Sequence, residues 1–162
     1  MKRISLPTQH APSASRQEVF SAQRKRVLYV EDEADNREVA SARLGKVYEL
    51  LLAPDDVSAC RMLTEHGEQL WLVLMDIELK GSRLSGIDLA RLMRGKLESR
   101  RLPPYAEAVP ELDVPIIFVT AYGKSYPRTD LILSGGGEVI DKPVDFVQLH
   151  TAIARHCLAK RG

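Results

Sequence analysis

The sequence is poor in the features that stabilise small secreted proteins or hold a chain in a membrane. Its 162 residues include only two cysteines and one tryptophan. Cys60 and Cys157 lie far apart in predicted helices, which excludes a dense disulfide framework and favours buried thiols in a reducing compartment. No apolar run approaches the length of a membrane span, and the N-terminal segment lacks the apolar core of a signal peptide. We therefore expect a cytoplasmic protein without membrane attachment.

The charge is nearly balanced overall but unevenly distributed. The formal net charge is +1, whereas residues 1–26 carry six basic side chains and one acid, Glu18, which gives them a local charge of +5. The rest of the chain then carries −4, which suits an acidic pocket, and we expect no direct binding of nucleic acid. We interpret residues 1–24 as a basic, flexible tail and residues 25–160 as one domain. Whether the tail is a docking segment or a solvated leader stays open.

Short apolar runs alternate with helical patterns after residue 25. The predicted strands cover residues 27–30, 48–53, 70–75, 114–119 and 138–140, and the predicted helices cover about 35–46, 57–66, a segment from 87 onward, 126–133 and 144–158. Apolar runs bounded by polar residues are typical of buried parallel strands, and the most apolar run, 70–75, should be central. The alternation predicts a doubly wound α/β sandwich on a five-stranded parallel sheet. Prolines at 103, 104 and 110 exclude a continuous helix, and we expect an exposed insertion there.

Polar residues stand at the carboxyl ends of four predicted strands. In chain order they are Glu31 and Asp32, then Asp76, Thr120 and Lys142. The ligand crevice of an open parallel sheet lies beyond these strand ends, so we expect the side chains to share one pocket. Each residue alone is weak evidence, because acids at strand ends often cap helices, but their joint occurrence is informative. Three acids without a counter-charge would repel one another, so the set predicts a bound Mg²⁺ beside the lysine.

The expected metal ligands follow from the preferences of Mg²⁺, which favours octahedral oxygen ligation and takes one or two carboxylates from a protein. Asp32 and Asp76 fit as direct ligands. Glu31 would act directly or through water, and the backbone carbonyl of Glu78 would complete the protein ligands. A phosphoryl donor would add an oxygen to the same cation.

Four stretches of this chain resemble, in order and spacing, the receiver domain of two-component response regulators, the CheY-like family. They are VLYVEDE, LVLMDIEL with GIDLARLMR behind it, FVTAY and IDKPVD. The resemblance covers about residues 25–160. It implies a flavodoxin-like fold with strand order 2-1-3-4-5. It also implies a phosphoprotein that receives its phosphoryl group from a sensor histidine kinase or a phosphotransfer protein.

The resemblance implies a role for each site residue. Asp76 would be the phosphoacceptor and the preceding acidic pair would hold Mg²⁺. The hydroxyl of Thr120 and the backbone N–H of Ala121 would bind phosphoryl oxygens, whose charge Lys142 would balance. The Lys142–Pro143 peptide is often cis in this family. Catalysis would extend only to the protein's own phosphotransfer and autodephosphorylation.

The sequence departs from the usual family pattern in three places. The acidic pair is Glu-Asp instead of the commoner Asp-Asp. The connection after Asp76, residues 77–85, is longer than usual and lacks the usual proline, which bears on the position of the Glu78 carbonyl. Val139 stands three residues before Lys142, where an aromatic switch residue is usual. We therefore expect the output to run through the region of the fourth helix.

Three alternatives remain open. A phosphatase of the haloacid dehalogenase type also surrounds Mg²⁺ with acids, a hydroxyl and a lysine, but its nucleophile lies on the first strand. A flavin- or nucleotide-binding module needs a phosphate loop after the first strand, where Glu31, Asp32 and Glu33 would repel phosphate. A receiver that binds partners without phosphorylation would retain all these residues. Only four residues follow Leu158, so we expect a stand-alone receiver acting on a downstream protein; a homodimer, or a longer parent protein, stays open.

Overall fold

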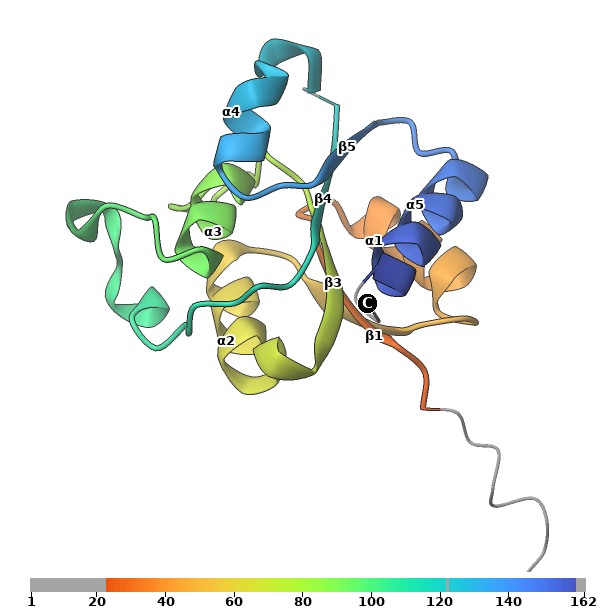
Figure 1. Cartoon of the computed structure of the whole chain (residues 1–162), viewed down its shortest axis with the longest axis horizontal. Coiled ribbons are helices and arrows are strands. Elements are labelled where there is room, and N and C mark those ends of the chain that lie inside the picture. Colours follow the sequence, from red (N-terminus) through yellow and green to blue (C-terminus); the bar gives the residue numbers. More distant parts are fainter. Residues whose placement is uncertain (1–22, 122, 160–162) are drawn as a thin grey trace, which may run out of the picture.

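Within the described residues, five parallel strands form one sheet in the order β2-β1-β3-β4-β5 (Figure 1). They are β1 (Arg26–Val30), β2 (Glu49–Ala53), β3 (Leu70–Met75), β4 (Ile116–Thr120) and β5 (Glu138–Asp141). This computed structural model describes residues 23–121 and 123–159, so nearly all of the predicted tail lies outside it. The fold class, the strand order and the central place of β3 are confirmed.

Helices cover both faces of the sheet. The α-helices of the described residues are α1 (Ala34–Leu44), α2 (Asp56–His66), α3 (Gly86–Met93), α4 (Arg128–Leu133) and α5 (Phe146–Ala159). Short 3₁₀ turns occupy Gly67–Gln69, Ser99–Arg101, Pro104–Ala106 and Gly123–Ser125. Helices α1 and α5 lie on one face, and α2, α3 and α4 lie on the other (Figure 1). None of the described helices is long and apolar enough to cross a bilayer.

Two hydrophobic clusters, one on each face, explain why the inner strands read as continuous apolar runs. Successive side chains of a strand point to opposite faces, so β1 and β3 contribute alternately to the two clusters. Leu28 and Val73 belong to the cluster beneath α2 and α3, whereas Val27 and Leu72 belong to the cluster beneath α1 and α5. Because both faces are covered, polar side chains are tolerated only where these strands end.

The segment between α3 and β4, residues 97–113, differs from the prediction. We expected an exposed insertion at residues 103–110. Instead the whole segment, here called the α3–β4 insertion, packs against α2, and Ala106 and Leu112 are buried within the core. Its other packed apolar side chains are Leu97, Leu102, Tyr105 and Val109. The prediction was wrong because the prolines only prevent a helix, whereas the apolar residues between them pack on the core. β4 begins at Ile116, two residues later than predicted, because Pro115 before it has no backbone N–H to donate to the sheet.

Candidate functional site

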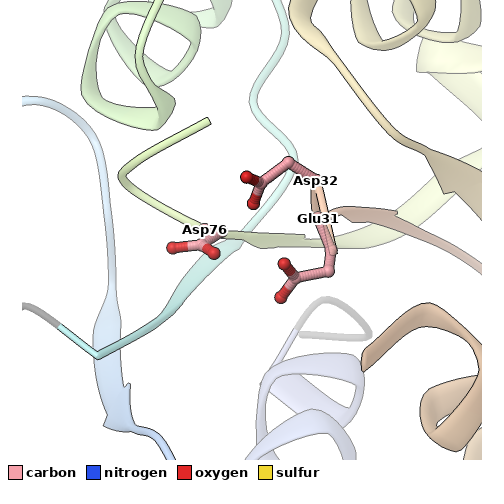
Figure 2. A group of neighbouring side chains, drawn as sticks. All are labelled: Glu31, Asp32 and Asp76. Carbon is pink, nitrogen blue, oxygen red and sulfur yellow. The ribbon is translucent and has the colours of Figure 1, made fainter. Parts of the chain in front are cut away.

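Three acidic side chains meet at the carboxyl ends of the neighbouring strands β1 and β3 (Figure 2). Glu31 and Asp32 follow β1, and Asp76 follows β3. One carboxylate oxygen from each lies within 4.8 Å of the others. Glu31 and Asp76 are buried, with 0% and 5% of their surface exposed, whereas Asp32 is half-buried. The topology thus brings together the acids that the sequence separates by more than forty residues.

Lys142, the residue after β5, reaches across the sheet edge to this cluster. Its Nζ donates to Glu31 Oε2 at 2.5 Å and to Asp76 Oδ2 at 2.8 Å. Burial lowers the pKa of Lys142, but hydrogen bonds and charge from these two acids outweigh it, so the pKa lies above its usual value. The ammonium is therefore held in its charged form. The Lys142–Pro143 peptide is cis, as the resemblance implies.

One ammonium does not balance three carboxylates. Burial is the largest influence on Asp76 and raises its pKa, Lys142 lowers it, and the charges of Glu31 and Asp32 raise it again, so that the pKa is about 6. At neutral pH the buried carboxylate is ionised in surroundings that disfavour its charge. A divalent cation would supply the missing positive charge.

Tyr29 is a member of the site that the sequence analysis missed. Its hydroxyl donates to Glu31 Oε2 at 3.0 Å, while Glu31 Oε1 accepts the backbone N–H of Glu33 at 3.0 Å. Burial, followed by the charge and hydrogen bond of Glu31, raises the pKa of Tyr29, so the phenol keeps its proton and donates. A tyrosine two residues before an acid shares its face of the strand, and this spacing was the available signal.

The open side of the site is a cleft of about 370 Å³. Its lining includes Asp32, Glu33, Asn36, Asp76, Glu78, Lys80, Ala121, Lys142 and Pro143. The backbone N–H of Lys80 donates to Asp32 Oδ2 at 3.1 Å and so fixes one wall of the cleft to the acidic pair. Thr120 is fully buried at the end of β4, in register with Asp141 of β5. Ligation by the Glu78 carbonyl stays a prediction.

Gly86 permits the close approach of α3 to the end of β3. A Cβ atom there would lie 1.9 Å from the carbonyl oxygen of Asp76. The backbone N–H of Gly86 donates to the carbonyl of Ile77 at 2.8 Å, which closes the connection between the strand and the helix. A larger residue would push α3 away from the strand end that carries Asp76.

A parallel sheet of this order, with acids and a lysine gathered at its carboxyl edge, is the architecture of receiver domains. Residues 27–154 match the model of the response regulator receiver domain, and the chain belongs to this family. It is thus a receiver domain of the two-component systems.

A curated relative is similar in sequence, and two solved structures share the fold. The uncharacterized transcriptional regulatory protein YrkP of Bacillus subtilis is 29% identical over 129 residues, which cover 79% of this chain and 47% of YrkP. The chain therefore spans about half the length of that relative. The structure of NtrX from Brucella abortus in complex with ADP has a TM-score of 0.68 and 23% sequence identity. The match covers 85% of this chain and 28% of the NtrX chain. A receiver domain protein from Clostridium thermocellum has a TM-score of 0.67 at 21% identity, over 85% and 97% of the two chains.

One solved neighbour contains a metal. The receiver domain of the sensor histidine kinase PA1611 from Pseudomonas aeruginosa has a magnesium ion coordinated in its active site cleft. It is 25% identical, with a TM-score of 0.64, over 83% of this chain and 98% of its own. Receiver domains typically bind Mg²⁺ at an acidic site, and the cluster of Glu31, Asp32 and Asp76 is such a site by composition.

Proposed function

We propose that this receiver accepts a phosphoryl group on Asp76, with Mg²⁺, from a sensor histidine kinase or a phosphotransfer protein, and that phosphorylation alters its contacts with a downstream protein. The observation that carries the proposal is the cluster of carboxylates bridged by Lys142, whose Nζ lies 2.8 Å from Asp76 Oδ2. A surface acid with an ordinary structural role needs neither this burial nor this partner. The location that fits such a role is the cytoplasm.

The chemistry assigned to the pocket is a single phosphoryl transfer. The Asp76 carboxylate attacks the phosphorus of a phosphohistidine; an O–P bond forms, the N–P bond breaks, and the imidazole leaves with that electron pair. Lys142 offsets the charge of the arriving phosphoryl oxygens. Thr120 and the N–H of Ala121 would hold these oxygens from the side of β4. Attack of water on the acyl phosphate later restores the carboxylate and releases inorganic phosphate.

The residues present fit a Mg²⁺ ion. Asp32 and Asp76 would be direct ligands, because both line the open cleft. The Glu31 oxygens already accept from Tyr29, Glu33 and Lys142, so Glu31 would hold the ion through a water and not as a direct ligand. When bound, Mg²⁺ neutralises the charge shared by the carboxylates and the transferring group.

We expect the signal from phosphorylated Asp76 to reach the partner without a change of rotamer in an aromatic switch residue. Val139, in the middle of β5, lines a pocket of about 210 Å³ with Gly123, Lys124 and Leu131 among its neighbours. A valine side chain has little volume to move between rotamers. Movement of the segment between β4 and α4 toward a phosphorylated Asp76 is therefore the expected output.

Incubation with acetyl phosphate tests the proposed function directly. The wild type should gain the mass of one phosphate in Mg²⁺, lose that gain in EDTA, and show a Mg²⁺-dependent spectral change with beryllofluoride. Asp76→Asn should gain no phosphate, whereas Asp141→Asn, a nearby exposed acid, should behave as the wild type.

Each contrary result selects a different reading. Incorporation that persists in Asp76→Asn would move the acceptor to another residue. A wild type that stays unmodified, also with a phosphorylated phosphotransfer protein, would favour the receiver that works without phosphorylation. Turnover of a small phosphomonoester without a kinase would favour the phosphatase.

A further inference from the structure

Two further buried acids lie away from the phosphoacceptor cluster, and each joins the same two chain segments. Asp56 is the first residue of α2 and Asp88 lies in the first turn of α3, with 3% and 4% of their surface exposed. Both accept hydrogen bonds from the connection between β3 and α3, residues 77–85, and from the α3–β4 insertion. The proposed phosphoryl transfer uses neither of them.

Asp56 holds three consecutive residues of the β3–α3 connection. Its Oδ2 accepts the backbone N–H of Leu84 at 2.9 Å and of Arg83 at 3.2 Å, and its own N–H donates to Ser82 Oγ at 3.1 Å. The same Oδ2 accepts the hydroxyl of Tyr105 from the insertion. Burial alone would raise the pKa of Asp56, but the hydrogen bond from Tyr105 and those from the connection hold the pKa below its usual value. The carboxylate therefore stays charged and binds these donors strongly.

Asp88 holds the next residue of the connection. Its Oδ2 accepts both the N–H and the hydroxyl of Ser85, each at 3.1 Å, and Ser85 in turn accepts the N–H of Asp88 at 3.2 Å, which forms a capping box. The insertion adds Arg101, whose Nη2 donates to the same Oδ2 at 2.9 Å. Residues 82–85 are thus held by two acids, and the insertion supplies a donor to each.

The other half of the connection forms the wall of the cleft. Glu78 and Lys80 line it, and the Lys80 N–H is the group bonded to Asp32. Gly81 joins the two halves with a φ of +78°, a backbone conformation that favours glycine, and the Ser82 N–H donates to the Leu79 carbonyl at 3.1 Å across this turn. The position of the wall therefore depends on how firmly residues 82–85 are anchored.

We propose that the α3–β4 insertion is a brace, which through Tyr105 and Arg101 positions the β3–α3 connection and thereby sets the affinity of the cleft for Mg²⁺. The inference rests on the proposed function, because it assigns a control of the same site. Tyr105 and Arg101 are positioning residues. The competing explanation is that their contacts only fasten the insertion to α2, with no effect at Asp32.

The test uses the full chain carrying Tyr105→Phe and Arg101→Gln together. Tyr105→Phe keeps the ring that packs on the core and removes only the hydroxyl. The control is Arg100→Gln, because Arg100 is the neighbouring arginine, is 83% exposed in its side chain and bonds to the exposed Glu98. Mg²⁺ affinity is measured by calorimetric titration, the Lys80 amide resonance by NMR in metal-free protein, and stability by urea unfolding.

We expect the double variant to bind Mg²⁺ about 3- to 10-fold more weakly. This is less than the about 10- to 100-fold typical for losing a direct partner of a metal ligand, because Tyr105 and Arg101 act on Asp32 only through the connection. Its Lys80 amide resonance should shift before metal is added, and Arg100→Gln should match the wild type in both measurements. A double variant that loses stability but keeps the wild-type Mg²⁺ affinity and amide resonance would show that these contacts only attach the insertion to α2. That result would refute the proposal. Phosphate incorporation by the wild type is scored separately, so a failure of the brace and a failure of the proposed function give different results.

Discussion

Replacement of Asp76 by asparagine should stabilise the metal-free protein at neutral pH, because it removes a buried charge while preserving the size of the side chain. The pKa of Asp76 is about 6 in the folded chain, against the ordinary 3.8 expected when unfolded. The folded state thus holds the proton more tightly. The stability that the protonated Asp76 carboxyl contributes is fully present below about pH 4 and is lost as the pH rises through about 6.

The size of the effect follows from that difference in pKa. About two units at 1.36 kcal/mol each give about 3 kcal/mol as the upper bound. We expect Asp76→Asn to raise the free energy of unfolding by about 1–3 kcal/mol near pH 7.5 in EDTA, because Lys142 keeps Glu31 as its partner at 2.5 Å. The gain should fall to about half near pH 5 and vanish below about pH 4.

Urea unfolding in EDTA across this pH range measures the difference between wild type and variant. Asp141→Asn serves as the control, because that carboxylate is exposed and its removal should change stability by less than about 0.5 kcal/mol. Added Mg²⁺ should narrow the gap, since the metal binds the folded wild type and not the unfolded chain. A variant that is less stable than the wild type near neutral pH in EDTA, or a gap that does not change with pH, would refute the electrostatic reasoning.

Three other substitutions probe the same pocket. Gly86→Ala should lower the free energy of unfolding by about 3 kcal/mol and weaken Mg²⁺ binding, because the new Cβ would lie 1.9 Å from the carbonyl oxygen of Asp76. A Mg²⁺ affinity equal to that of the wild type would contradict this. Lys142→Met should destabilise the protein in EDTA by about 2–4 kcal/mol, because it leaves buried carboxylates without their ammonium partner. Added Mg²⁺ should stabilise this variant by more than it stabilises the wild type, as measured by thermal unfolding with and without the metal. Tyr29→Phe should cost about 1–2 kcal/mol, as judged by urea unfolding, through the lost bond to Glu31; an unchanged midpoint would mean that water replaces the hydroxyl.

The sheet was predictable because a strand buried on both faces leaves a continuous apolar run in the sequence. The runs that became β1 and β3 end one residue before their acids, so the strand ends, and with them the pocket, followed from the same pattern. Lys142 was placed in the pocket by the same rule, because it follows the short apolar run that became β5. The family resemblance added the order of the strands and the role of the lysine.

The contacts of the α3–β4 insertion could not be predicted from local sequence. Tyr105 and Asp56 are 49 residues apart, and nothing in their immediate neighbourhoods marks them as partners. Of two adjacent acids at the start of α2, Asp55 is the helix cap and accepts the Ser58 N–H at 2.7 Å, whereas Asp56 is buried. Which of two adjacent acids is buried is decided by tertiary packing, because only the folded chain brings donors to one of them.

The two acids of the Glu-Asp pair differ in side-chain length, and this difference gives them different contacts within the pocket. The longer Glu31 is fully buried and carries Lys142, Tyr29 and a backbone N–H on its two oxygens, while the shorter Asp32 stays half-buried beside the cleft. If Glu31 chiefly holds the lysine, Glu31→Gln should loosen Lys142 and slow phosphorylation while changing Mg²⁺ affinity less than Asp32→Asn does. Equal losses of Mg²⁺ affinity in calorimetric titrations of the two variants would instead make Glu31 a direct ligand.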